Sequence, residues 1–534
     1  MSGSRRKRFT LIATILGSTI VFLDATVVNV ALPSLSDDLN AGLADQQWVV
    51  EAYLLALVSL LLVGGSLGDQ FGRKRIFILG MTGFGITSVL CAIAPSTPIL
   101  IGARALQGFA GALLVPGSLA ILAATFEGAE RGKAVGTWTA WSGIATVLGP
   151  AGGGALVGAL SWRAIFWVNV PLIIVTAILA HRYIEESMDP EADRRIDFPG
   201  IALSALGLGG PVFALIEQPT HGWSDPLVYV PMIAGVILFA SFIVWEQRYS
   251  HSMLDLSLFK IRNFAVTNME TLVVYAGLIG ALFFVTLFLQ QTAGYTPFEA
   301  GLATTPISIV MFLLSPRFGR ISTATGPRVP MSVGPIVGGI GLLLLTRVGA
   351  HPDYVKDILP ALLVFSLGLS ATVAPLTATA LNSVAERHAG VASGINNGVS
   401  RVAGLLAIAI LGALISGQTA STIDSKLGTE PLSPPSQAAV QKAKDKPLSE
   451  VSVKGVPADE AARVTTAVTS ASEQSFHLGI GVGGVLMIAG GILAGIGLRN
   501  PRAAKDEEFV PAAATAGECA RKCADEAEPA KAPA

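Results

Sequence analysis

The sequence predicts an all-α polytopic membrane protein with fourteen transmembrane helices. Hydrophobic residues make up 51% of the 534-residue chain, charged residues only 14%, and the mean hydropathy is +0.61. A soluble domain carries about 25% charged residues. Because so apolar a chain would expose large apolar patches in water, we expect the lipid bilayer to be its solvent. The formal net charge of −1 indicates no nucleic-acid partner.

Apolar runs of roughly 20 residues, the length that a helix needs to cross a bilayer, recur along the whole chain. The predicted spans are 10–31, 47–68, 75–94, 98–123, 134–158 and 165–184, then 199–217 and 227–246, then 264–289, 298–316, 330–347, 358–382, 390–416 and 476–498. This grouping predicts an N-terminal six-helix bundle over 1–184, an inserted linker helix pair over 185–261 and a C-terminal six-helix bundle over 262–500. The first run is too long for a signal peptide, so we interpret it as a retained span.

Basic residues collect in alternate short loops, beginning with RRKR at 5–8. The intervening short loops contain only Arg163, Arg347 and Lys356. Because Lys and Arg favour the cytoplasmic side, we expect both termini to be cytoplasmic in a bacterial inner membrane. The connection 417–474 is then extracytoplasmic, and its second part is a candidate helix leading into the last span. The Ala-, Glu- and Pro-rich tail 501–534 is predicted to be disordered and cytoplasmic.

An aspartate, Asp24, lies inside the first apolar run, in LDATVVNVALP (23–33). A charged Asp at the centre of a membrane helix costs about 2.5–3.5 kcal/mol. Because burial favours the neutral acid, such a group can be neutral in one conformation and charged in another, as a proton carrier must be. The alternative is a structural hydrogen bond to a neighbouring helix, through Thr26 or Asn29.

An arginine, Arg104, lies in the fourth run, in RALQGFAGALLVPG (104–117). Arg104, Gln107, Gly108 and Gly111 share one helix face by their spacing. An intramembrane Arg needs a partner or a wet cavity, and Asp24 is an available counter-charge. A side chain that extends from near a helix end to water is the alternative.

Glycines recur at helical spacing in the fifth run, SGIATVLGPAGGGALVG (142–158). Pro150 removes a backbone donor and can kink the helix. Gly149 and Gly153, and likewise Gly154 and Gly158, lie four residues apart, so another helix can approach closely. Plain helix packing explains this pattern equally well.

The loop GSLGDQFGRKR (65–75) places Asp69 four residues before Arg73 at a helix end. The pair could latch to a neighbouring helix in one conformation only, although a simple turn in a basic loop is the alternative. SPRFGRISTATGPR (315–328) is weakly similar to this loop at the matching position of the second half. Repeated halves are typical of transporter folds.

Together these stretches resemble a known transporter family. GSLGDQFGRKR resembles the signature loop of the major facilitator superfamily, and LDATVVNVALP, RALQGFAGA and LGPAGGG resemble span motifs of its drug:proton antiporters. The first of these motifs, with SWRAIFWVNVP (161–171) and LDLSLFKIRNFAVTN (254–268), is typical of the fourteen-span branch. The resemblance covers about residues 9–416 and the last span.

The resemblance implies two six-helix bundles around a central cavity, an extra helix pair between them, and proton-driven export by alternating access. It also implies roles for particular residues: proton coupling for Asp24 and Arg104, a conformational latch for Asp69 and Arg73, and an antiporter bend for Gly149, Pro150 and Gly153.

The sequence departs from the family pattern in both halves. Thr323 and Ala324 stand where relatives often have an Asp-Arg pair, which weakens any second latch. Glu51 stands in the second span where a small hydroxyl residue is expected, and Glu270 is a further acid in the ninth. Either acid could bind a second proton or attract a cationic substrate, although Glu51 is close enough to a span end to reach water.

The predicted function is proton-driven antiport of small lipophilic or cationic drugs or antibiotics by a monomer that is not an enzyme. Export of a single endogenous metabolite or antibiotic remains an alternative, and so does a sensor without transport. A membrane-embedded hydrolase is a weaker alternative, because GGSLG (64–68) matches a nucleophile motif around Ser66 but lacks the strand context.

No cofactor is expected beyond the proton gradient. EGAERGKAV (127–135) fails the phosphate-binding pattern, which argues against ATP as the energy source. The six His residues have no metal-ligand spacing. Cys91 lies in an apolar run as a small core residue, and Cys519 and Cys523 lie in the tail, so we expect no metal site and no disulfide framework.

Overall fold

The computed structural model describes residues 3–188, 197–249, 256–384, 389–428, 431–449 and 451–500. All regular elements within these ranges are helical, and the chain as far as Leu498 forms one compact unit. The predicted disordered tail, with Cys519 and Cys523, lies outside the described residues.

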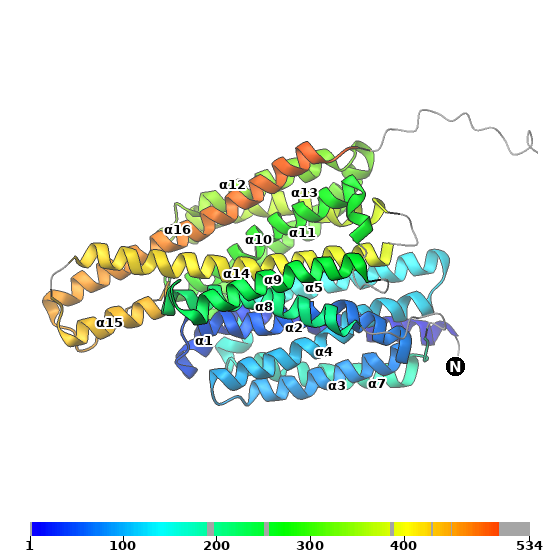
Figure 1. Ribbon diagram of the computed structural model, residues 1–534, viewed down its shortest axis with the longest axis horizontal. Helices are drawn as coiled ribbons and strands as arrows, with labels where there is room; N and C mark the ends of the chain where they lie inside the picture. The colour runs from blue at the N-terminus through cyan, green and yellow to red at the C-terminus, as the bar shows by residue number, and fades with distance from the viewer. Residues whose placement is uncertain are drawn as a thin grey trace, which may run out of the picture. The chain divides into compact units, whose positions relative to one another are not determined.

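The first six predicted spans form one group of packed helices, drawn in blue and cyan in Figure 1. α2 and α3 both pack along α4, and α1 packs along α5 and α7. α6 and α7 together make the sixth span, which is interrupted at Val168. The helices are α1 (Gly3–Leu39), α2 (Leu43–Phe71), α3 (Arg73–Ala92), α4 (Thr97–Thr125), α5 (Gly128–Ala159), α6 (Ala164–Trp167) and α7 (Asn169–Tyr183).

The inserted pair is α8 (Phe198–His221) and α9 (Pro226–Arg248). Each begins at an aspartate that caps it, because Asp197 accepts a hydrogen bond from the Gly200 amide and Asp225 from the Leu227 amide. α9 packs mainly on α8, whereas α8 also contacts α2 and α14. The pair therefore rests on both halves through α8.

The C-terminal half packs mainly around α16, which contacts α10, α12 and α14. α11 begins at a capping box in which Thr296 and Glu299 satisfy each other's backbone amides. The helices are α10 (Arg262–Gln291), α11 (Pro297–Thr325), α12 (Arg328–Leu345), α13 (Leu359–Asn382), α14 (Ala389–Leu427), α15 (Pro434–Asp445) and α16 (Ala458–Gly497), with short helices η1 (Leu256–Lys260) and η2 (Tyr354–Ile358).

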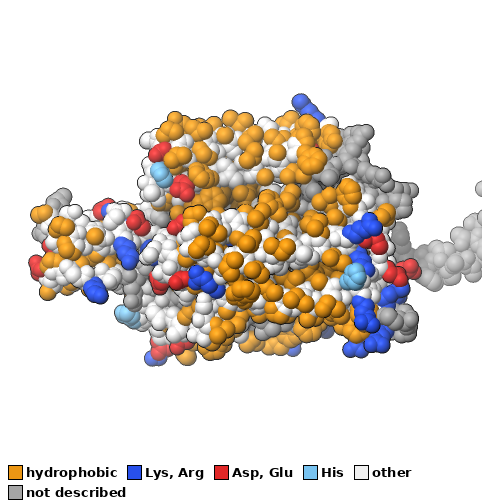
Figure 2. Space-filling model, turned by 90° about the horizontal axis from the view of Figure 1, so that it is seen from below, with side chains coloured by type: hydrophobic (Ala, Val, Ile, Leu, Met, Phe, Trp, Pro, Cys, Tyr) orange, Lys and Arg blue, Asp and Glu red, His pale blue; other side chains and the backbone are white. Residues whose placement is uncertain are grey.

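Twelve helical segments in the described ranges are long and apolar enough to cross a membrane. A broad hydrophobic band separates two ends where charged side chains gather (Figure 2). α2 and α5 coincide with predicted spans and have 29 and 32 residues, but they are not among the twelve. The multi-pass membrane architecture is thus confirmed, and the count of fourteen stays a prediction.

The connection 417–474 is largely helical. α14 continues to Leu427, α15 follows, and α16 begins at Ala458, as expected for a helix leading into the last span. Apolar side chains from all three helices, including Ile423, Val440 and Val468, pack in one buried cluster. In Figure 1 these extended ends of α14 and α16 project together beside α15.

The two halves meet at one end of the helices. We call it the far end, because it bears the α1–α2 and α10–α11 turns and is opposite the end where α1 begins. There the Gln47 amide donates to the Ile408 carbonyl at 2.6 Å, and the Gln290 amide donates to the Val30 carbonyl at 3.0 Å. One buried apolar cluster joins both halves there, whereas clusters near the other end belong to a single half. The halves are therefore closed at the far end.

Candidate functional site

Asp24 and Arg104 form an ion pair in the N-terminal half. The helices α1 and α4 bring them together, and Arg104 Nη1 donates to Asp24 Oδ2 at 2.5 Å. Both side chains are 0% exposed, so water reaches neither of them in this conformation. The predicted neighbours are in contact, while their role in proton coupling stays a prediction.

The second oxygen of Asp24 is held by neutral side chains. Asp24 Oδ1 accepts from Gln107 Nε2 at 3.2 Å and from Asn169 Nδ2 at 3.0 Å. Both amides also donate to Ser88 Oγ, at 2.9 Å and 3.3 Å. Sequence reasoning placed Gln107 on the face of Arg104 but missed Asn169 and Ser88, whose only sequence signal is a polar residue within an apolar run.

Arg104 is fixed from a third direction by α2. Its Nε donates to the Val49 carbonyl at 3.0 Å, and its guanidinium lies 4.2 Å from the centre of the Tyr53 ring. These contacts hold Arg104 whether or not Asp24 is ionised. A buried pair of this kind adds little net stability, but removing one charge leaves the other uncompensated. A single proton on Asp24 therefore changes the energy of this conformation substantially.

The glycines of α5 provide close contacts on two faces. Gly149 faces Thr26 and Gly153 faces Val27, both on α1 and within one turn of Asp24. Added side chains there would overlap α1. The predicted bend residue Pro150 lies inside a helix that continues unbroken to Ala159.

The other face of α5 contacts the second half. A Cβ on Gly154 would overlap the Pro297 carbonyl of α11, and a Cβ on Gly301 of α11 would overlap the Pro150 carbonyl. Gly158 has the same four-residue spacing, but a Cβ added to it would meet none of the described atoms within 4 Å, so close packing does not extend to it. α5 thus connects the helix of Asp24 to the far-end closure.

Asp69 and Arg73 are also in contact, at 2.7 Å between Oδ1 and Nε. The adjoining turn is tied to the chain after α7, because the Arg73 amide donates to the Ser187 carbonyl and the Lys74 amide to the Glu186 carboxylate. Gly72 makes this turn with a φ of +107°, a conformation that disfavours side chains. The latch role stays a prediction.

Glu51 and Glu270 are both fully buried, and their carboxylate oxygens have no hydrogen-bond partner among the described residues. Glu51 lies one turn after Gln47, which bonds to α14, so it belongs to the α2–α14 interface rather than to water. Glu270 lies midway between Val266 and Val274, which contact glycines of α16. Both suggested roles of these acids remain predictions.

An intramembrane arginine that sequence reasoning missed, Arg401, lies on α14. Its guanidinium is 5.7 Å from the centre of the Phe22 ring on α1, so it projects from one half toward the other. The signal was present in the sequence, because Arg401 interrupts an apolar run just as Arg104 does.

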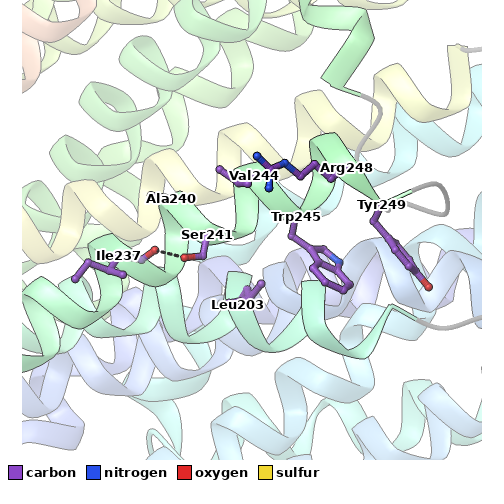
Figure 3. Close-up of a pocket in the computed structure, with 8 residues that line it drawn as sticks. All are labelled: Leu203, Ile237, Ala240, Ser241, Val244, Trp245, Arg248 and Tyr249. Carbon is purple, nitrogen blue, oxygen red and sulfur yellow. Dashed lines mark hydrogen bonds between the residues drawn. The ribbon is translucent and has the colours of Figure 1, made fainter.

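The remaining motifs and cavities give less indication of a functional site than the Asp24–Arg104 pair does. A groove of about 650 Å³ on the α8–α9 pair has a mostly apolar lining that includes Leu203, Ile237 and Val244 (Figure 3). Because the groove is apolar and lies on an exposed candidate membrane span, we expect lipid chains to fill it. The GGSLG segment lies within helix α2, not in a strand-turn-helix, and the side chain of Ser66 lies outside the described residues. No group of potential metal ligands occurs in the described part of the chain.

Comparison with known proteins supports the same architecture. The family model described as Major Facilitator Superfamily matches residues 14–408. The chain is 34% identical over 425 residues to "Multidrug resistance protein Stp" of Mycobacterium tuberculosis, which covers 79% of each chain. It is 30% identical over 517 residues to the "Tetracenomycin C resistance and export protein" of Streptomyces glaucescens, which covers 95% of each.

Solved transporters share the fold. A bacterial homologue of the lysosomal transporter Spinster, in an inward-facing and unoccupied conformation, aligns with a TM-score of 0.66 at 16% identity. The alignment covers 92% of this chain and 97% of that one. The family match and the named relatives indicate a transporter, not an enzyme. The chain belongs to the major facilitator superfamily.

Proposed function

We propose that this protein exports small drug or antibiotic molecules across the bacterial cytoplasmic membrane in exchange for protons. The names of the relatives, which include multidrug resistance and tetracenomycin C export, support the drug class. The observation that carries the proton coupling is the fully buried Asp24–Arg104 pair. A titratable acid inside a membrane domain marks an ion pathway by default.

In the proposed mechanism, a proton shifts the protein between a state closed at the far end and a state open there. With Asp24 ionised, its bonds to Arg104, Gln107 and Asn169 hold α1 in place. A proton on Asp24 removes the anion that all three donors share, so the energy of this arrangement rises. Because α1 packs on α5 and α5 packs on α11, a movement of α1 changes the contacts that close the far end. Exchange follows when substrate and proton bias one conformational equilibrium in opposite directions.

We further propose that α2 and α5 also cross the membrane, giving fourteen spans with both termini cytoplasmic and the far end outside. The lengths of these two helices, 29 and 32 residues, support this count. The test places one accessible tag within 417–474 and another at the C-terminus of the same monomeric protein. Labelling of both tags from the same side of the membrane would contradict the model.

The function is tested by expression in a drug-sensitive bacterial host. Wild-type protein is expected to lower accumulation of several unrelated antibiotics, and a protonophore should abolish the effect. Asp24→Asn should accumulate drug like the empty host. Asp37→Asn is the matched control, because Asp37 is exposed on the same helix. ATP-dependent efflux that survives the protonophore would contradict the proposal.

A dedicated exporter of one compound is the second candidate. The tetracenomycin C relative favours it, because that similarity spans nearly the entire length of both chains. Protection against a single antibiotic in an otherwise sensitive panel would support the dedicated exporter, whereas protection against several unrelated compounds would support multidrug export.

A further inference from the structure

We propose that a polar pocket in the C-terminal half, together with Arg401, binds the exported molecule and selects an organic anion that carries hydroxyl or carbonyl groups. This inference rests on the proposed export function and narrows its substrate class. The sequence alone suggested lipophilic or cationic substrates, attracted by Glu51 or Glu270. The arrangement of charges in the structure favours the opposite sign.

The pocket lies between three helices of the C-terminal half. Its volume is about 40 Å³, and six of its lining residues are neutral and polar: Tyr275 of α10, Thr377 of α13, and Ser393, Asn396, Asn397 and Ser400 of α14. A cavity needs about 10–15 Å³ of such volume to hold one water. The pocket therefore has room for a small polar group, such as a hydroxyl or carbonyl substituent, with the rest of a larger molecule outside it.

The pocket is held in shape by side-chain hydrogen bonds. Asn396, which is 8% exposed, donates to Thr271 Oγ1 at 2.8 Å and to Asn268 Oδ1 at 3.2 Å. These bonds use its amide protons and fix the orientation of the side chain. Pre-formed polar groups of this kind bind a ligand without the entropic cost of being ordered first.

Arg401 supplies a positive charge beside the pocket. It lies one helical turn after the lining residue Asn397, so the two share a face of α14. In the described part of the chain no carboxylate lies within ion-pair distance of Arg401. Its guanidinium lies 5.7 Å from the centre of the Phe22 ring, and Phe22 precedes Asp24 by two residues. An intramembrane arginine needs a counter-charge, and a substrate anion can supply it.

None of the three membrane acids considered above pairs with Arg401 in the described part of the chain. Asp24 is already paired with Arg104. Glu270 lies in the α10–α16 interface, and no partner is found for the buried oxygens of Glu51. Arg401 is thus the charged side chain that projects from α14 toward α1, and its sign favours an anion.

Binding of two xanthene dyes to the purified full-length protein in lipid nanodiscs tests the inference. Fluorescein is a hydroxylated anion, and pyronin Y is a cation with the same tricyclic core. We expect wild-type protein to bind fluorescein more tightly. Arg401→Gln should weaken fluorescein binding by about 10-fold or more, since a hydrogen bond to a charged group is lost, and should leave pyronin Y unaffected. Asn397→Ala should weaken fluorescein binding by about 2- to 10-fold.

Two further variants keep the test independent of misfolding. Arg401→Lys retains the charge and should retain most of the fluorescein affinity. Arg347→Gln removes an equal charge from an exposed position and should change nothing. Tighter binding of pyronin Y by wild type, unchanged fluorescein binding by Arg401→Gln, or no binding of either dye would overturn the proposal.

A competing role for Arg401 is a pair with Glu51 in another conformation. It predicts that Arg401→Gln and Glu51→Gln both lose export while fluorescein binding is unchanged, a result that overturns the substrate site. The binding assay uses no pH gradient. Failure of proton coupling, seen as unchanged efflux by Asp24→Asn, therefore leaves the binding result intact and is distinguishable from failure of the site.

Discussion

Replacing Gly154 by Ala should open the far end. The added methyl group would overlap the backbone of Pro297 and Phe298 at the start of α11. That backbone cannot yield easily, because the capping box of Thr296 and Glu299 fixes it. Insertion of a methyl into such a contact costs about 1–3 kcal/mol.

The cost falls on one conformation only. The α5–α11 contact exists when the halves are closed at the far end, whereas the better helix propensity of Ala is gained in both states. A difference of about 1–3 kcal/mol changes the ratio of two states by about 5- to 150-fold. Gly154→Ala should therefore populate a state that is open at the far end.

Pulsed electron paramagnetic resonance between spin labels measures this shift, in a chain whose three native cysteines are replaced. Labels at exposed positions 160 and 355 report on the far end, and labels at 127 and 324 report on the other end. In Gly154→Ala the first distance should lengthen and the second shorten. Gly158→Ala is the matched control, since its methyl meets nothing within 4 Å. Wild-type distances in Gly154→Ala, or an equal shift in Gly158→Ala, would refute the reasoning.

Two substitutions test the packing of the site. Asp24→Ala leaves Arg104 buried without its counter-charge and should lower unfolding stability by about 3–5 kcal/mol in a thermal or denaturant assay. The double variant Asp24→Asn with Arg104→Gln should lose less unfolding stability than Asp24→Ala. An equal loss of stability would show that the uncompensated charge of Arg104 is not the cause. Gly72→Ala should lower unfolding stability by about 1–3 kcal/mol from its φ of +107°, and the added methyl should displace the Glu186 carboxylate from the Lys74 amide. Gly222 also has a positive φ, but a Cβ added there would meet none of the described atoms within 4 Å, so Gly222→Ala should lower stability less. A larger loss of stability in Gly222→Ala than in Gly72→Ala would contradict this reasoning.

The charged centre could be predicted because charges are rare in apolar runs. Asp24 and Arg104 stand out for this reason, and helical spacing placed Gln107 beside Arg104. Asn169 and Ser88 are neutral, and neutral polar residues are common in membrane helices, so their partners depend on packing that a single sequence does not contain. Arg401 had the same signal as Arg104 and was overlooked.

Contacts between the halves were beyond sequence reasoning for a different reason. Gly154 and Gly158 have equal spacing in the sequence, but only Gly154 meets another helix. Which glycine is in contact depends on how the two halves are placed, and a single sequence does not contain that placement. Likewise, Glu51 lies near a predicted span end, yet it is fully buried.

The central claim, that Asp24 couples protons to export, is tested most directly in inside-out membrane vesicles with an imposed pH gradient, acid inside. Lipophilic cations, organic anions and natural antibiotics are added in turn while proton efflux is followed. Wild-type vesicles should lose the gradient on addition of a substrate, and Asp24→Asn vesicles should keep it. Equal substrate-triggered efflux in both would contradict the claim and remove Asp24 from the proton path.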